Sequence, residues 1–154
     1  MEHLICDAML GKLAKWLRIL GFDTLYEREI KDEKLIEKVG KTGRILLTAD
    51  RRLAVRKILR GKVILINSFF LKEQLKETIE KLHLQIRGEK IFFRCLICNS
   101  PLLPICKEKI KNRVPPYVYK TISSFSICPL CDKIYWLATH RERMISRLEY
   151  LLEV

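Results

Sequence analysis

The sequence contains no long hydrophobic run. The longest uncharged apolar stretch, "VILINSFFL" at residues 63–71, is far shorter than the roughly 20 residues that a membrane-spanning helix needs. The first residues, Met1-Glu2-His3, lack the basic segment of a secretory signal peptide, and the apolar run after them is too short for one. These absences predict a cytoplasmic protein that has no membrane partner.

Internal repeats and low-complexity segments are also absent, and acidic residues are in the minority. Hydrophobic residues make up 49% of the 154 residues, which is enough for a packed core and argues against wholesale disorder. Lys and Arg number 30 against 18 acids, which gives a net charge of +12. Such a balance serves solubility or indicates a polyanionic partner, and the most common polyanionic partner is nucleic acid.

Strand and helix patterns alternate along the first half of the chain. Short apolar runs predict strands over residues 3–6, 23–27, 44–48 and 62–67. Helical spacing predicts helices over 8–20, from Asp32 to near Gly43, over about 50–60 and over 68–82. This alternation predicts an α/β fold with a mainly parallel sheet and helices on both faces. The pattern breaks at 84–90, so we expect domains at 1–86 and 87–154, the second ending in a helix over 141–152.

The second half of the chain contains two Cys-x2-Cys pairs. Cys95 and Cys98 form one, Cys128 and Cys131 form the other, and residues 99–127 separate them. In a reducing compartment such pairs indicate metal more often than disulfides, although two redox dithiols are the alternative. Four thiolates complete a tetrahedral Zn²⁺ shell with no open position, so the pattern predicts a structural site in a zinc ribbon. We expect His140 to lie outside the ligand shell.

Three aspartates lie at the junctions between predicted strands and predicted helices. Asp7 follows the first predicted strand, Asp50 follows the third, and Asp32 begins the second helix. The carboxyl ends of parallel strands meet at one edge of a sheet, so we expect these acids on a common rim. Carboxylates gathered in a basic protein suit Mg²⁺ or Mn²⁺, which activate water at a phosphodiester. The alternative is that each Asp only caps a helix.

Basic residues surround the predicted acidic site. They occur on the first helix, in the run after Asp50 that contains no acid, and before the "VPPYVYK" segment of the second domain. Each group is either a solvated surface or a set of RNA phosphate contacts. The candidate RNA-binding residues are Lys12, Lys15, Arg18, Arg51, Arg52, Arg56, Lys57, Lys107, Lys109, Lys111 and Arg113. Tyr117, Tyr119, Tyr135 and Trp136 are candidates either for base stacking or for the ribbon core.

Five ordered segments carry a family resemblance. They are "DAMLGKLAKWLRILGFDT", "GRILLTADRRL", "RCLICNSPL", "VPPYV" and "CPLCDKIYW". Together they resemble the Mut7-C RNase family, in which a PIN-like nuclease domain is fused to a C-terminal zinc ribbon. The resemblance implies a three-layer PIN-like fold, a ribbon closed by Zn²⁺ and divalent-metal-dependent cleavage of RNA. It also implies that Asp7, Asp32 and Asp50 are catalytic. Some PIN-like domains carry an acid where this chain has Arg52.

The leading hypothesis is therefore a metal-dependent ribonuclease acting as an endonuclease. Its cofactors would be structural Zn²⁺ and catalytic Mg²⁺ or Mn²⁺, and its partner would be RNA, with ribosomal and transfer RNA as candidates. The second hypothesis is a non-catalytic RNA- or ribosome-binding module, which Arg52 favours. The third is a toxin-type nuclease held by a protein partner. The built-in ribbon argues against the third, because it supplies a recognition element of its own.

Overall fold

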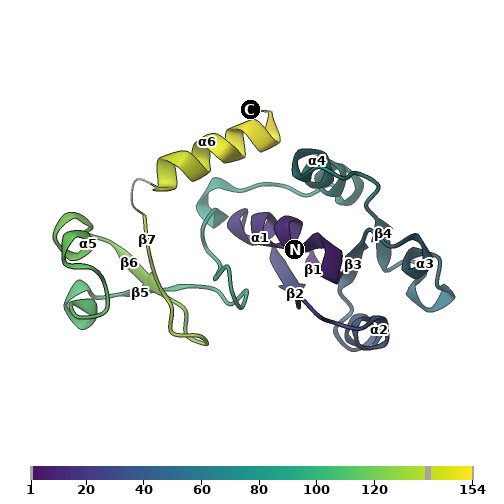
Figure 1. Ribbon diagram of the computed structural model, residues 1–154, viewed down its shortest axis with the longest axis horizontal. Coiled ribbons are helices and arrows are strands. Elements are labelled where there is room, and N and C mark those ends of the chain that lie inside the picture. The colour runs from purple at the N-terminus through teal and green to yellow at the C-terminus, as the bar shows by residue number, and fades with distance from the viewer. Residues whose placement is uncertain (1, 138–139, 154) are drawn as a thin grey trace. The chain divides into compact units, whose positions relative to one another are not determined.

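The computed structural model describes residues 2–137 and 140–153. Contacts between residues divide the chain into two compact units, Met1–Asn99 and Ser100–Val154. Figure 1 shows the first unit as an α/β domain and the second as a small antiparallel sheet with helices, of which α6 is the longest. The first unit extends past residue 86, so the first cysteine pair falls within it. The domain boundary at 86/87 stays a prediction.

The first unit is built on a four-stranded parallel sheet. Its strands are β1 (His3–Cys6), β2 (Asp23–Tyr26), β3 (Ile45–Thr48) and β4 (Val63–Leu65). They are hydrogen-bonded in the order β2-β1-β3-β4, and every neighbouring pair is parallel. Because β2 and β3 lie on opposite sides of β1, the chain reverses direction across the sheet between β1 and β3. This reversal is a topological switch point, where open α/β sheets bind their ligands.

Helices cover both faces of this sheet (Figure 1). The 3-10 helix η1 (Ala8–Leu10) leads into α1 (Gly11–Ile19), which packs with α4 (Leu71–Leu82) on one face. Helix α2 (Asp32–Thr42) packs with the 3-10 helix η2 (Lys57–Leu59) on the other. The three-layer α/β arrangement with a parallel sheet confirms the predicted fold class.

Alternation along the strands explains why both faces are covered. Ile5 and Leu46 are 1% and 0% exposed and pack in one cluster with Leu35 and Val39 of α2. Their neighbours Leu4 and Leu47 are also 0% exposed, and successive strand residues point to opposite faces. The strands therefore bury apolar side chains on both sides, as a parallel sheet requires.

The helix predicted over residues 50–60 is wrong in its extent. Helix α3 covers only Arg51–Ala54, the chain is extended at Arg56, and η2 follows. Leu53 and Leu59 are each 1% exposed and belong to the same core cluster. Six residues apart on one helix, they would point in directions about 120° apart around its axis. Breaking the helix lets both leucines reach the core.

The segment after α4 packs closely on the end of α1. Gly21 has a φ of +92°, and a Cβ atom there would lie 2.4 Å from the carbonyl oxygen of Lys90, at the end of η3 (Gly88–Lys90). The Phe92 N–H donates to the Ile19 carbonyl at 2.8 Å, and Arg94 Nε donates to the Gly21 carbonyl at 3.0 Å. Only glycine fits this approach, which attaches the segment leading to Cys95 to the first unit.

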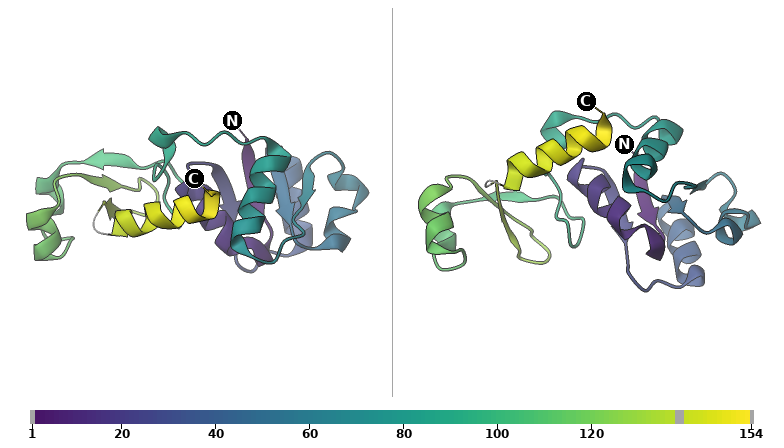
Figure 2. Two further views of the ribbon diagram at one scale, coloured as in Figure 1. Left: turned by 90° about the horizontal axis from the view of Figure 1, so that it is seen from above. Right: turned by 45° about the horizontal axis from the view of Figure 1, so that its top comes forward.

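The second unit has an antiparallel sheet in the order β5-β6-β7. The strands are β5 (Leu103–Ile105), β6 (Phe125–Ile127) and β7 (Ile134–Trp136), and the helices are η4 (Lys107–Ile110), α5 (Pro116–Thr121) and α6 (His140–Leu152). Ile110, Val114, Phe125 and Ile134 form its core. Figure 2 shows the three strands from two further directions. None of the helices in the described parts of either unit has the length and apolar character needed to cross a membrane.

Candidate active site and metal centre

Asp7 and Asp50 lie at the switch point of the parallel sheet. Asp7 directly follows β1, and Asp50 comes two residues after β3. The Asp7 N–H donates to the Leu47 carbonyl at 3.0 Å, so the backbone at the end of β1 is held against β3. Two of the three acids that the sequence placed on one rim, Asp7 and Asp50, therefore occupy adjacent strand ends.

The Asp7 carboxylate is buried and held by three hydrogen bonds. The residue is 5% exposed. Its Oδ1 accepts from the Met9 N–H at 2.8 Å, which caps η1. Its Oδ2 accepts from the Ala49 N–H at 2.8 Å and from the Thr48 hydroxyl at 2.5 Å. A buried carboxylate fixed in this way has one orientation. Oδ2 already accepts two hydrogen bonds, so the lone pair that stays free for another partner is on Oδ1.

Thr48 connects the two acids. It is 0% exposed, its Oγ1 donates to Asp7 Oδ2, and the same Oγ1 accepts from the Asp50 N–H at 3.0 Å. Sequence reasoning missed Thr48 as a site residue, although it lies in the "LLTAD" segment that the family resemblance used. A hydroxyl two residues before an aspartate at a strand end was the available signal.

Asp50 caps α3. Its Oδ1 accepts from the Arg52 N–H at 2.8 Å and the Leu53 N–H at 3.3 Å. Within the described residues, Oδ2 accepts no hydrogen bond from the protein. Capping and metal binding are therefore compatible here, because the cap uses one oxygen and leaves the other available.

Asp32 is placed differently from the other two acids. It is the first residue of α2, is exposed, and joins neither Asp7 nor Asp50 through a hydrogen bond among the described residues. The three carboxylates do not form a compact ligand group within residues 2–137 and 140–153. The catalytic role of Asp32 stays a prediction.

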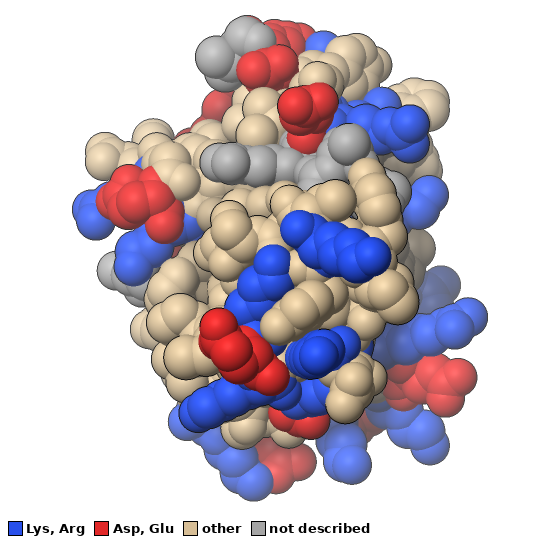
Figure 3. All heavy atoms as spheres, turned by 90° about the vertical axis from the view of Figure 1, so that its left-hand side faces the viewer, with Lys and Arg blue, Asp and Glu red and all other residues tan. Residues whose placement is uncertain are grey.

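Most of the basic residues predicted to contact RNA are exposed. Lys12 and Lys15 are exposed on α1, and Arg51, Arg52, Arg56 and Lys57 are exposed after Asp50. In the second unit, exposed Arg113 pairs with Asp132 at 2.8 Å, and half-buried Lys107 lies 4.8 Å from the Tyr119 ring centroid. Lys109 and Lys111 are exposed. Figure 3 looks onto the second unit, where blue basic side chains gather beside a few red acids.

Arg18 is the exception among these basic residues. It is 5% exposed, and its guanidinium donates to the carbonyls of Thr24 at 2.8 Å, Leu96 at 2.9 Å and Ile97 at 3.1 Å. Burial lowers the pKa of Arg18, and the nearby Cys95 and Cys98 sulfurs oppose that shift. With its donors committed to carbonyls, Arg18 has little to offer a phosphate, so we leave it out of the RNA-contact surface.

The four predicted zinc ligands come together. The sulfur atoms of Cys95, Cys98, Cys128 and Cys131 all lie within 4.8 Å of one another. A tetrahedral shell with Zn–S bonds of about 2.3 Å has sulfur–sulfur distances of about 3.8 Å, so the cluster could bind zinc. The Cys131 N–H donates to Cys128 Sγ at 3.4 Å, which stabilises sulfur in the thiolate form.

The first cysteine pair is attached to β2 by Asn99. The Asn99 side chain accepts from the Thr24 N–H at 2.9 Å and donates to Asp23 Oδ1 at 2.7 Å. Asp23 also accepts from Arg44 at 2.7 Å and His3 at 2.9 Å. Burial raises the pKa of Asp23, but these hydrogen bonds outweigh it and hold the pKa well below its usual range. Asp23 lies at the amino end of β2, away from the rim of Asp7 and Asp50.

The two remaining cysteines differ in exposure. Cys6 is fully buried in β1, and burial raises the pKa of its thiol far above the usual range. It is therefore a neutral, small apolar side chain, as the sequence indicated. Cys106 is exposed, and nothing in the structure explains it. The side chain of His140 lies outside the described part of the chain.

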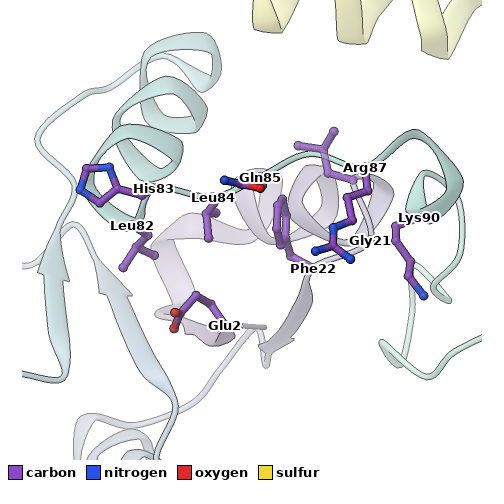
Figure 4. Close-up of a pocket in the computed structure, with 10 residues that line it drawn as sticks. Glu2, Gly21, Phe22, Leu82, His83, Leu84, Gln85, Arg87 and Lys90 are labelled. Carbon is purple, nitrogen blue, oxygen red and sulfur yellow. The ribbon is translucent and has the colours of Figure 1, made fainter.

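A hollow of about 500 Å³ lies near the amino ends of β1 and β2, at the end of the strands opposite to Asp7 (Figure 4). Its lining includes Glu2 before β1, Phe22 before β2, and Leu84 and Arg87 after α4. It contains neither Asp7 nor Asp50. The candidate catalytic acids therefore lie outside this hollow.

The fold and the sites define an α/β protein with an acid pair at the switch point of a parallel sheet and a four-cysteine cluster able to bind zinc. Residues 2–148 match the protein family described as "Mut7-C RNAse domain". The chain belongs to the Mut7-C RNase family, and membership implies nuclease activity with RNA as the substrate. No curated protein matches the chain.

Proposed function

We propose that this protein is a divalent-metal-dependent ribonuclease with a PIN-like fold that cleaves RNA internally. The observation that carries the proposal is the pair of Asp7 and Asp50 at adjacent strand ends, joined through the hydroxyl of Thr48. An acid pair at a switch point, next to exposed arginines, suits a metal-bound phosphate.

The donor set fits a hard divalent cation. Mg²⁺ and Mn²⁺ accept carboxylate oxygens and keep several waters, so one or two carboxylates are sufficient. Asp50 Oδ2 and the remaining lone pair of Asp7 Oδ1 would hold the ion. When bound, the ion would supply positive charge at the scissile phosphate and lower the pKa of a ligated water.

The chain's own residues supply orientation and binding. Thr48 holds Asp7 in one orientation, and the cap on α3 fixes Asp50. Arg51, Arg56 and Lys57 are exposed after Asp50, where they would bind the RNA backbone and keep the phosphate at the acids.

We propose that the cysteine cluster holds one structural zinc ion per chain. With four sulfur ligands, the shell would be closed to water and substrate, so zinc would stabilise the fold and take no part in cleavage. Exposed Lys109 and Lys111 of the second unit would add phosphate contacts and aid RNA binding. Elemental analysis of freshly purified protein tests the zinc assignment, and a content well below one zinc per chain contradicts it.

Cleavage of a circular RNA tests the activity, because a circle offers no ends to an exonuclease. We expect wild-type protein to open the circle with Mg²⁺ or Mn²⁺, and Asp50→Asn to be inactive. Asn caps a helix about as well as Asp but is a poor ligand for a hard cation, so Asp50→Asn should unfold at the wild-type temperature. Asp32→Asn in the same assay decides whether the third acid takes part.

Arg52 supports one alternative, a non-catalytic RNA-binding module. It is exposed and stands where some PIN-like domains carry an acid. Retained RNA binding without cleavage in Mg²⁺, Mn²⁺ or Co²⁺ would establish this alternative. Cleavage by Asp50→Asn at the wild-type rate would instead show that the acid pair is not the active site.

A further inference from the structure

Two adjacent phenylalanines of the first unit are displayed to water. Phe69 is 94% exposed and Phe70 is 75% exposed. Both lie in the loop that joins β4 to α4. A pair of large aromatic side chains in water is costly for a soluble domain, so it indicates a binding surface.

This loop is held rigidly by two side chains of α4. Glu77 accepts from the N–H groups of Asn67 at 3.1 Å and Ser68 at 3.2 Å, and from the Ser68 hydroxyl at 2.9 Å. Gln74 Nε2 donates to the Ser68 carbonyl at 3.0 Å. The exposure of the two rings is therefore fixed by the fold, as expected for a binding loop on a rigid scaffold.

The same loop leaves the sheet at the rim of the acid pair. The Ile66 N–H, just after β4, donates at 2.8 Å to the carbonyl of Thr48, whose hydroxyl contacts Asp7. Phe69 comes three residues later, so its Cα lies within about 11 Å of Ile66. An RNA held at Asp7 would pass within reach of the rings.

The charge around this rim selects the kind of ligand. Arg51 and Arg52, directly after Asp50, are exposed at this rim, and the segment that they begin contains no acid from residue 51 to residue 62. Its other exposed basic residues, Arg56, Lys57, Arg60 and Lys62, follow as the chain returns to the amino end of β4, because β3 and β4 are parallel. Aromatic faces beside a row of basic side chains match single-stranded nucleic acid, in which phosphates and unstacked bases alternate. An acidic peptide would match the charge but would leave the two planar rings without a stacking partner.

We propose that Phe69 and Phe70 form a stacking platform for unpaired bases, which makes single-stranded RNA the substrate class of this rim. The proposal rests on the proposed ribonuclease function and deepens it. Duplex RNA keeps its bases stacked inside the helix, so it would contact the basic row but not the rings.

Binding assays with the full chain test the platform. The background is Asp50→Asn, which keeps the RNA intact, and the probes are a single-stranded 12-mer, the same 12-mer with abasic positions, and a duplex. We expect Phe69→Ala to weaken binding of the single-stranded probe about 10-fold, because each stacked base contributes within this range. The abasic and duplex probes should bind unchanged. Phe69→Trp should retain wild-type affinity, and Phe69→Leu should not.

The salt dependence separates stacking from charge. The loss caused by Phe69→Ala should be the same at 50 and 200 mM salt, because no phosphate contact is removed. The matched control is Val55→Ala, which removes an apolar side chain that is 80% exposed in the basic segment but has no ring. It should bind every probe as the Asp50→Asn protein does.

Several outcomes overturn the platform without touching the proposed function. Unchanged affinity of the Phe69→Ala, Phe70→Ala double variant would do so, and so would equal losses for all three probes. Self-association of the wild-type protein that Phe69→Ala abolishes would show that the rings bind a second copy instead. A third result would separate the two proposals. If Phe69→Ala weakens binding of the single-stranded probe with bases alone, but the wild-type protein opens no circular RNA, the stacking platform stands and the proposed nuclease activity is refuted.

Discussion

The Thr48 hydroxyl donates a 2.5 Å hydrogen bond to the buried carboxylate of Asp7. This bond makes the orientation of Asp7 depend on a residue of the neighbouring strand. Removing the hydroxyl leaves the Asp7 carboxylate with two of its three hydrogen bonds, so its orientation is held less tightly.

We predict that Thr48→Val lowers kcat for RNA cleavage by about 10- to 100-fold, the usual cost of losing a residue that orients a metal ligand. RNA affinity should not change, because Thr48 is fully buried and cannot touch RNA. Thr48→Ser keeps the hydroxyl and should recover most of the activity. Single-turnover cleavage rates measure the effect, and equal rates for Thr48→Val and wild type would contradict the positioning role.

We predict that Arg18→Met speeds the release of zinc about 10-fold. The guanidinium holds the carbonyls of Leu96 and Ile97, between the two cysteines of the first pair, and its loss frees that turn to move. The variant should also unfold more easily, by about 1–3 kcal/mol, because buried carbonyls lose their donor. The rate of zinc transfer to a coloured chelator measures the effect. Lys15→Met, an exposed change on the same helix, is the control and should release zinc at the wild-type rate.

We predict that RNA affinity falls steeply with salt. Six or more phosphate contacts would give a slope of log K against log [salt] of about −4 or steeper for single-stranded RNA. Arg56→Ala should make the slope shallower by about 0.7, because one contact is lost. Lys41→Ala at the far end of α2 should leave it unchanged. A slope near zero for the wild-type protein would remove the case for a basic binding surface.

We predict that part of the stability depends on Glu77 and is lost in acid. Burial raises its pKa, but hydrogen bonds from Lys81, Asn67 and Ser68 outweigh this and lower the pKa from 4.5 to about 2. The stabilisation is therefore complete above pH 4.5 and disappears as the pH falls toward 2.

Urea unfolding of wild-type protein and Glu77→Gln over a series of pH values from 5.5 down to 2 isolates the contribution of Glu77. Glu77→Gln should lower the free energy of unfolding by about 2 kcal/mol at pH 5.5, and the difference from wild type should shrink steadily below pH 4.5. Comparing the two proteins at each pH cancels the other acids and the loss of zinc. A difference that stays constant down to pH 2 would show that the charge of Glu77 does not matter.

Much of the fold could be predicted from local sequence patterns. Short strand-like segments predicted all four strands of the first unit. Three of them are mainly apolar, as expected for strands covered on both faces, whereas β2 at the edge of the sheet reads Asp-Thr-Leu-Tyr. The extent of the helix after Asp50 could not be predicted, since its break depends on where Leu53 and Leu59 meet the core. That requirement comes from tertiary packing, which overrides local propensity.

The candidate sites also contain residues that local sequence patterns predict and residues that they do not. The cysteine spacing predicted the zinc cluster because its chemistry is local to each pair. Arg18 looked like an RNA contact because Lys12, Lys15 and Arg18 recur every three residues, which places them in one sector of a helix. Its true partners lie 78 and 79 residues away in the sequence, and no local pattern records them.

The hydrogen bond from the Thr24 N–H to Asn99 has a consequence for how the protein is made. Thr24 is fully buried at the edge of the sheet, and its partner comes 75 residues later in the chain. On the ribosome, β4 ends at Leu65, so all four strands are synthesised before Asn99 exists. Until the first cysteine pair leaves the exit tunnel, the Thr24 N–H at the edge of the nascent sheet has water as its only partner. Completion of the nuclease fold during translation is therefore tied to the arrival of the metal-binding segment, and a chain released earlier would be a target for proteolysis.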